Sequence, residues 1–339
     1  MNPLRYLLAP WWVIELATGA KAFSDNPIIG SRRLNARGLH AARIRLAHGL
    51  GAWRRARLRP LVSAADAAAF DRDGYVCVRD FLPAKQFERL RAQVLGHAAP
   101  AREQVQGDAI TRRIALDPAT LAALPELGAL LAHPRWRGLI RYAWSYDAEP
   151  LTYIQTILSH RIDAPPDPQT DLHADTFHPT AKAWLFLTDV AEDEGPLTYV
   201  AGSHRLTPER LAWERAQSQA AKHGPNRLSA RGSLRIRPDE LAALGLPQAT
   251  RFAVPANTLV VCDTNGFHAR GIAARPSMRI EIWADGRRSP FLPWTGLYLG
   301  GLPGLAERRV VLWWGLRDRL KRWMPQHWAD VGRKRPGDA

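Results

Sequence analysis

A histidine and an aspartate two residues apart place the tightest constraint on the fold of this chain. His173 and Asp175 lie just before a strongly apolar run at residues 183–187. On an extended segment, side chains two residues apart project to the same face. The pair can therefore offer an imidazole nitrogen and a carboxylate oxygen to one metal ion. Because such pairs are common by chance, a third ligand is needed before a metal site is predicted.

A second stretch, at residues 258–285, supplies the candidate third ligand. An apolar run at 259–262 leads into His268, and Arg279 follows 11 residues later, which leaves room for a turn and a returning strand. Two histidines and one carboxylate on one side of a metal leave three coordination positions open, a pattern typical of non-haem Fe(II) oxygenases. An arginine facing the same cavity suits a keto-dicarboxylic acid, because a guanidinium binds a carboxylate bidentately and keeps its charge.

Each of these residues also has an ordinary structural interpretation. His268 could be a hydrogen-bonded core histidine, and Arg279 could be a surface residue. The complete ordered pattern is much harder to obtain by accident than any one of its members. We therefore favour a metal site that includes both stretches.

Further motifs resemble the phytanoyl-CoA dioxygenase superfamily. They are the early stretches 70–76 and 80–82, the acidic turn 192–197, the run 200–204, and the two stretches described above. The resemblance covers roughly residues 62–286. It implies a mainly β fold with flanking helices, built on a double-stranded β-helix, the cupin-like jelly roll. It also implies Fe(II), 2-oxoglutarate and O2 as cofactor and co-substrates.

The resemblance also assigns roles to individual residues. It implies that iron is held at the catalytic centre by His173, Asp175 and His268, and that 2-oxoglutarate is held by Arg279 in a pocket lined by Gln155 and Trp184. Many relatives carry a short hydroxyl residue directly after the distal histidine. Here Ala269 and Arg270 follow it, so the second contact to the 2-oxoglutarate carboxylate is not identified. An aspartate at 175 favours hydroxylation, because halogenases of the superfamily leave that position open for chloride.

The net charge of +15 is concentrated at the two ends of the chain. Residues 1–60 carry +9 and residues 287–339 carry +7, which leaves the middle at −1. Both ends are also rich in tryptophan. We therefore divide the chain into a basic N-terminal arm (1–60), a dioxygenase jelly-roll domain (61–286) and a basic, Trp-rich C-terminal helical segment (287–339).

Both terminal segments contain a predicted amphipathic helix. In the first, residues 39–58, an apolar stripe is accompanied by arginines on the other faces; the stripe consists of Leu39, Ala42, Leu46, Leu50 and Trp53. In the second, residues 305–323, basic residues surround the face Leu312, Trp313, Leu316, Leu320 and Trp323. Such helices bind anionic membrane surfaces. The alternative is that the stripes pack on the catalytic domain while the arginines face water.

Other features narrow the choice of function. The apolar segment 4–17 is interrupted by charge and proline, and it is shorter than the roughly 20 residues that span a bilayer. Cys77 and Cys262 are expected to be buried, reduced thiols. Nucleic acid is an unlikely partner because no DNA- or RNA-binding motif occurs. A cytoplasmic protein, peripheral on the inner face of the membrane, is therefore expected.

Four further polar residues are candidate metal ligands or pocket residues. They are His160, His178, His204 and Asp263. His178 is expected in the substrate pocket or at the surface, His204 in a hydrogen bond to a barrel loop, and Asp263 in a turn.

The sequence thus predicts an Fe(II)- and 2-oxoglutarate-dependent hydroxylase acting on a lipid, glycolipid precursor or acyl conjugate at the membrane surface, through residues 1–60 and 305–328. Two alternatives stay open. One is a dioxygenase free of the membrane that acts on a small metabolite or natural product. The other is a non-catalytic, membrane-associated jelly roll that only binds a partner.

Overall fold

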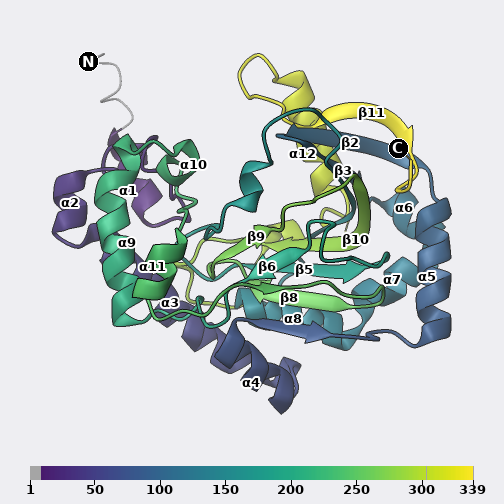
Figure 1. Ribbon diagram of the computed structural model, residues 1–339, viewed down its shortest axis with the longest axis horizontal. Coiled ribbons are helices and arrows are strands. Elements are labelled where there is room, and N and C mark those ends of the chain that lie inside the picture. Colours follow the sequence, from purple (N-terminus) through teal and green to yellow (C-terminus); the bar gives the residue numbers. More distant parts are fainter. Residues whose placement is uncertain (1–8, 303, 339) are drawn as a thin grey trace.

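Two antiparallel sheets form the centre of the protein (Figure 1). The computed structural model describes residues 9–302 and 304–338. The large sheet has the strand order β1-β8-β5-β10-β4-β3-β2-β11, and the small sheet has the order β7-β6-β9. The strands are β1 (Tyr75–Val78), β2 (Ala99–Gln106), β3 (Ala109–Ala115), β4 (Leu151–Ser159), β5 (Ala181–Phe186), β6 (Leu197–Tyr199), β7 (Thr250–Arg251), β8 (Leu259–Asp263), β9 (His268–Arg270), β10 (Ser277–Gly286) and β11 (Ala329–Lys334).

Strand β10 shows how the large sheet separates a core face from a polar face. Ile280 and Ile282 belong to the principal hydrophobic core, together with residues of the surrounding helices. Because side chains alternate along a strand, Arg279, Glu281 and Trp283 project to the opposite face. That face lines the interior of the jelly roll. The predicted fold, mainly β with flanking helices around a cupin-like core, is confirmed.

Helices cover the large sheet on its outer side and extend from one end of the molecule (Figure 1). They are α1 (Ala9–Leu16), α2 (Arg32–Ala36), α3 (Leu39–Leu58), α4 (Ala64–Asp73), α5 (Ala84–Gly96), α6 (Pro118–Ala123), α7 (Pro125–Ala132), α8 (Pro134–Trp144), α9 (Pro208–Ala220), α10 (Arg227–Ala230), α11 (Pro238–Ala243) and α12 (Arg309–Arg319). Helices α5, α7 and α8 contribute Leu90, Leu127 and Ile140 to the principal core. Ser63 and Asp117 are the N-caps of α4 and α6, and each accepts a hydrogen bond from the third backbone amide that follows.

Some elements of the fold were not apparent from the sequence. Residues 118–132 form two helices, because Pro125 begins a new one after Leu124 leaves the helical conformation. Strands β2 and β11 were not anticipated, since APAREQVQ and ADVGRK lack a run of apolar residues. They pair with each other and extend the large sheet beyond β3.

Buried arginines help to attach the N-terminal helices to the rest of the protein. Arg54 of α3 is 1% exposed and donates to the backbone carbonyls of Ser145 (3.0 Å), Pro290 (3.1 Å) and Leu292 (2.7 Å). Arg43 similarly donates to three carbonyls of the segment that follows α1. The expectation that the arginines of this helix face away from the protein is therefore wrong for both residues. Their guanidinium donors satisfy carbonyls at loop ends that have no secondary-structure partner.

The C-terminal helix α12 is anchored differently. Val310 and Trp314 are its buried residues, and they pack in a second hydrophobic cluster. The predicted apolar face is exposed, with Leu312 at 56% and Trp323, just beyond the helix, at 82%. In the described part of the chain, no helix combines the length and apolar character needed to cross a membrane.

The two cysteines are free thiols. Cys262 is buried, as expected, whereas Cys77 is exposed. Cys77 lies on β1, the edge strand of the large sheet, so the expectation of burial was wrong for this residue. An apolar run at a sheet edge can have one uncovered face, and the run itself does not reveal this.

Candidate active site

Backbone pairing brings three candidate ligands together at one end of the small sheet. His173 lies in the loop after β4 and forms a two-residue bridge with His268, the first residue of β9. The two residues exchange N–H···O bonds of 3.0 Å in both directions. The Asp175 amide donates to the Thr264 carbonyl at 2.9 Å. These contacts hold the loop that carries His173 and Asp175, the HxD loop, against the segment that leads into β9.

The geometry of the three side chains suits one metal ion. One nitrogen of each histidine and one oxygen of Asp175 lie within 4.8 Å of one another, and all three residues are buried. His173 Nε2 is 3.7 Å from Asp175 Oδ1, and His268 Nε2 is 3.7 Å from Asp175 Oδ2. Separations of this size leave space for an ion between the ligand atoms.

Hydrogen bonds set the orientation of both imidazoles. His173 Nδ1 lies 2.7 Å from the Asp171 carbonyl, and His268 Nδ1 lies 2.9 Å from the Gly266 carbonyl. A carbonyl only accepts, so each Nδ1 carries the proton and each Nε2 keeps a free lone pair directed at the shared space. His268 Nε2 is buried without a hydrogen-bond partner. A buried nitrogen with a free lone pair and no hydrogen-bond partner fits the role of a metal ligand.

The protonation states also fit metal binding. Burial lowers the pKa of His268 to about 4 and that of His173 well below its usual value, so both rings are neutral at physiological pH. Burial alone would raise the pKa of Asp175. Lys182 and the nearby His268 and Arg287 outweigh this effect and hold the pKa well below its usual range. Two neutral imidazoles and one carboxylate are the forms that ligate a divalent ion.

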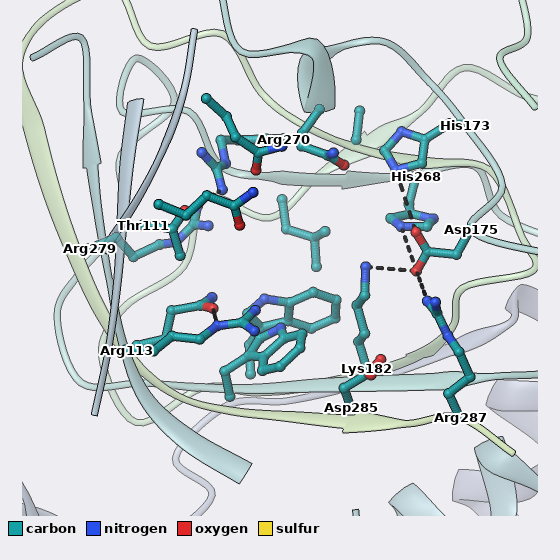
Figure 2. A pocket seen from close by; sticks show the side chains of 18 of the residues that line it. Thr111, Arg113, His173, Asp175, Lys182, His268, Arg270, Arg279, Asp285 and Arg287 are labelled. Carbon is teal, nitrogen blue, oxygen red and sulfur yellow. Dashed lines mark hydrogen bonds and ion pairs between the residues drawn. The ribbon is translucent and has the colours of Figure 1, made fainter. Parts of the chain in front are cut away.

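Cationic side chains surround the candidate carboxylate ligand (Figure 2). Lys182 Nζ on β5 is 2.7 Å from Asp175 Oδ2, and Arg287 Nη2 lies 3.7 Å from the same oxygen. Lys21, from the N-terminal segment, donates to the Asp175 backbone carbonyl. Burial, with a contribution from Arg287, lowers the pKa of Lys21 to about 8. None of these three cations was anticipated, because only the folded chain brings them beside Asp175.

A cavity of about 300 Å³ extends from the three ligands into the jelly roll, and Figure 2 places Arg279 at its far side. Gln155, Trp184 and Arg279, the residues expected to bind 2-oxoglutarate, all line it. Arg279 Nε contacts Glu281 Oε2 at 2.8 Å, and its Nη1 donates to the Gly195 carbonyl at 2.8 Å. Gln155 donates to the other oxygen of Glu281 at 2.6 Å. Glu281 is fully buried, and it was not predicted from the sequence as a site residue.

The remaining cavity wall includes two more unanticipated arginines. Arg270 Nη1 is 2.6 Å from Asp167 Oδ2, which ties the residue after Ala269 to the loop before the HxD pair. Arg113, on β3, donates to Gln155 Oε1 at 2.8 Å. Trp328, from the C-terminal segment, also lines the cavity. Alternation along β3 could have suggested that Arg113 points inward, but nothing in the sequence places Trp328 there.

The other polar candidates lie outside this cavity. His178 is buried and has Nδ1 3.0 Å from the Pro179 carbonyl. Asp263, which was expected to be a turn residue, is buried and forms an ion pair of 2.7 Å with Arg55. His204 is buried against Phe70, and its Nδ1 has no hydrogen-bond partner. His160 is at the surface, 3.7 Å from Asp108.

Comparison with known proteins identifies the family. The family model described as phytanoyl-CoA dioxygenase (PhyH) matches residues 70–243, just over half of the chain. The chain belongs to the phytanoyl-CoA dioxygenase family. This membership confirms the resemblance noted in the sequence and makes the protein an iron- and 2-oxoglutarate-dependent oxygenase. No curated protein matches the chain significantly in sequence.

Solved structures of low sequence identity show partial similarity. The epimerase SnoN from nogalamycin biosynthesis is 22% identical, with 68% of this chain and 82% of that chain covered and a TM-score of 0.43. HygX from Streptomyces hygroscopicus, solved with nickel, 2-oxoglutarate and hygromycin B, is 15% identical over 72% and 93% of the two chains, with a TM-score of 0.41. EctD from S. alaskensis, solved with iron, is 20% identical over 66% and 76%, with a TM-score of 0.36.

Proposed function

We propose that this family member holds Fe(II) through His173, Asp175 and His268, and 2-oxoglutarate through Arg279. The observation that carries the proposal is the convergence of the three ligand atoms within 4.8 Å, in a buried site with both Nε2 atoms unprotonated. When bound, iron and 2-oxoglutarate supply the oxidation of a substrate C–H bond by O2, with succinate and CO2 as co-products. The reaction class expected from Asp175 is hydroxylation.

The cavity residues prepare the 2-oxoglutarate site. Glu281 and the Gly195 carbonyl fix the Arg279 guanidinium through Nε and Nη1, which leaves Nη2 for a carboxylate oxygen. Gln155 holds Glu281 from the other side. Trp184 and Trp283 are register partners on β5 and β10 and give the cavity an apolar floor that limits water near the metal. A fixed guanidinium binds with less loss of side-chain entropy than a mobile one.

We also propose that the substrate is an amphipathic molecule, a lipid, glycolipid precursor or acyl conjugate, taken from an anionic membrane surface. The support is the exposed apolar face at α12, with Trp313, Leu316 and Trp323 among arginines. Interfacial helices combine these residue types, and each basic side chain near an anionic leaflet contributes roughly 1 kcal/mol. Residues 1–8 of the proposed N-terminal contact lie outside the described residues.

One observation favours the alternative of a small, polar metabolite or natural product. The cavity is lined by amides and cations rather than by aliphatic side chains; these include Gln104, Gln106, Gln169, Lys182 and Arg270. A long acyl chain would bury poorly there. The polar lining of the cavity is compatible with an amphipathic substrate if only the polar head of that substrate enters the cavity.

Succinate formation from 2-oxoglutarate, measured with added Fe(II), tests the assignment of the iron ligands. We expect His173→Ala and Asp175→Ala each to abolish succinate formation and to weaken Fe(II) binding, measured by calorimetry under anaerobic conditions. His160→Ala is the matched control, because His160 lies outside the cavity, and it should retain both properties. Full Fe(II) affinity in Asp175→Ala would refute the proposed ligand set.

A further inference from the structure

Among the described residues, Arg113 is the one cavity cation that has no direct ion pair with a carboxylate; Asp285 and Glu281 act on it only from a greater distance. Of the five cations that line the cavity, Arg270 lies 2.6 Å from Asp167 and Arg279 lies 2.8 Å from Glu281. Lys182 and Arg287 both face Asp175, at 2.7 and 3.7 Å. The polar contact of Arg113 is the neutral amide of Gln155, reached through Nε.

Three aromatic rings hold the Arg113 guanidinium in place. Its central carbon lies 4.0 Å from the ring centre of Trp283, 4.6 Å from that of Trp328 and 4.7 Å from that of Tyr153. Stacking on aromatic faces stabilises a guanidinium without using its N–H donors. Nε donates to Gln155, and the guanidinium also contacts the Tyr153 hydroxyl, which leaves the remaining Nη hydrogens for a ligand in the cavity. This is how a binding site presents an arginine, since a structural arginine uses its donors on the protein, as Arg54 does.

The charge balance of the cavity points to an anion. Five cations line it, and four carboxylates lie in it or contact those cations: Asp167, Asp175, Glu281 and Asp285. The charges of Fe(II) and 2-oxoglutarate cancel each other. One positive charge is then left over in a partly buried cavity, where a charge is less well solvated than in bulk water. A substrate with one negative group offsets that charge.

We infer that Arg113, within the aromatic box of Tyr153, Trp283 and Trp328, binds an anionic group of the substrate, a carboxylate or a phosphate ester. Figure 2 shows Arg113 at the opposite side of the cavity from the three candidate iron ligands, with Lys182 between them. The anionic group would therefore anchor one end of the molecule while another part lies at the metal. Arg113 is a specificity-determining residue on this inference, which rests on the proposed iron and 2-oxoglutarate site.

The box is partly built by a segment outside the family match. Trp328 directly precedes β11, whose pairing with β2 fixes its position, and the Trp328 carbonyl accepts from Arg102 at 3.1 Å. The family model ends at residue 243. The anion preference would therefore be a property of this chain and of relatives with the same C-terminal strand.

Binding of matched charged and uncharged probes tests the inference. The full-length protein, loaded with Zn²⁺ and saturated with 2-oxoglutarate, is titrated by calorimetry with octanoate, octyl phosphate and the uncharged octanamide. We expect at least one of the two anions to bind at least tenfold more tightly than octanamide, because a charge-assisted hydrogen bond is lost with the amide. A carboxylate-selective result and a phosphate-selective result distinguish the two substrate classes. Equal affinity for all three probes would overturn the inference.

Substitutions then test which residue causes the preference for anionic probes over octanamide. In Arg113→Met, the anion preference should fall below threefold while 2-oxoglutarate affinity stays within twofold of the natural protein. In Trp328→Ala, which keeps the charge, all three probes should weaken by similar factors. Arg113→Lys, a second variant that retains the charge, should keep part of the preference, and Arg251→Met at the surface should keep all of it. Thermal unfolding of each variant identifies any that fail to fold.

The outcomes separate this inference from the proposed function. If Arg113→Met lowers 2-oxoglutarate affinity as much as Arg279→Met does, Arg113 holds the co-substrate and the inference is wrong. If the natural protein binds neither divalent metal nor 2-oxoglutarate, the proposed function itself is wrong. An anion preference that survives in Arg113→Met would also refute the assignment to this residue.

Discussion

Helices α3 and α12 look alike in sequence but are used in opposite ways. Both carry an apolar stripe with arginines around it. In α3, Arg43 and Arg54 face the protein and are buried, and Trp53 of the stripe is half-exposed. In α12, Val310 and Trp314 make the buried apolar contact, and Arg309 at the first position donates to the carbonyls of Glu149 and Pro150. Arg319 and the rest of the stripe lie towards solvent.

The difference shows that an arginine-rich helix can be bound to its own protein as well as to a membrane. A guanidinium with five donors can satisfy several loop carbonyls at once, which no apolar side chain can do. The inward face of α3 carries Ile44 and Ala47 as well as the two arginines, so the stripe predicted from the sequence is left largely exposed. The periodicity of the sequence identifies the helix but not the face that is used.

The largest effect is expected at Arg54 of α3. Arg54→Ala should lower the free energy of unfolding by about 3–5 kcal/mol, because the carbonyls of Ser145, Pro290 and Leu292 lose their buried charged donor. Urea denaturation followed by tryptophan fluorescence measures it. Arg57→Ala, one turn away and stacked on the exposed Trp53, should change stability by less than about 0.5 kcal/mol. Equal effects would erase the contrast between structural and surface arginines.

The second test concerns the apolar face at α12. Changing Leu312, Trp313 and Leu316 together to Ser should reduce binding to vesicles of anionic phospholipid about a hundredfold, since each buried apolar side chain contributes roughly 1 kcal/mol or more. Flotation or sedimentation with vesicles measures the bound fraction. The matched α3 variant, Leu46→Ser with Trp53→Ser, should bind nearly as well as the natural protein. Failure of the natural protein to bind such vesicles would remove the membrane proposal.

Acid should weaken the α3 side of the molecule. Burial is the main cause that lowers the pKa values of His178 and His204 to about 3, and both lie near His48 of α3. The unfolded chain takes up these protons near pH 6.5, whereas the folded chain does not. Their stabilising contribution is complete above about pH 6.5 and declines as the pH falls towards 3. We expect a loss of about 2 kcal/mol per histidine between pH 7 and 5.

Denaturation at several pH values checks this expectation. In His204→Gln, the loss between pH 7 and 5 should shrink by about the share of one histidine. If the free energy of unfolding of the natural protein is unchanged over this range, these histidines are not held neutral in the folded state.

The smallest effect is expected from single charges near the exposed face of α12. Arg317→Gln or Arg319→Gln should weaken vesicle binding about fivefold each, and the difference should disappear at high salt because exposed charges are screened. The corresponding change at Arg45, on the exposed side of α3, should have no comparable effect. Equal losses at both helices would indicate that net charge alone drives membrane binding.

Much of the fold could be predicted because local patterns agreed with the final structure. The helix predicted at residues 39–58 is α3 with the same limits, and the apolar run at 259–262 lies in β8. The returning strand expected to carry Arg279 is β10. The missed strands β2 and β11 are polar, and the partner of β11 is β2, more than 200 residues earlier in the chain. Such long-range pairing leaves no local signal.

The residues of the candidate site also fall into two groups: those that the spacing in the sequence could suggest, and those that only the folded chain brings together. His173, Asp175 and His268 could be proposed from spacing, since backbone alternation and a returning strand predict their convergence. Arg279 lines the cavity, but its ion pair with Glu281 was not foreseen. Lys182 and Arg113 were missed because a basic residue in a strand carries no mark of which cavity it will face. Charge balance inside a cavity becomes visible only once all its walls are known.

The edge position of β11 has a consequence for where this enzyme can be shortened. A polypeptide that stops at residue 286 would keep every proposed iron ligand but would lack Trp328, so one wall of the catalytic chamber would be missing. It would also uncover β2, whose unpaired amides and carbonyls can recruit a strand from another molecule. Ending the chain at residue 286, the predicted limit of the jelly-roll domain, would therefore yield a less discriminating and more aggregation-prone oxygenase.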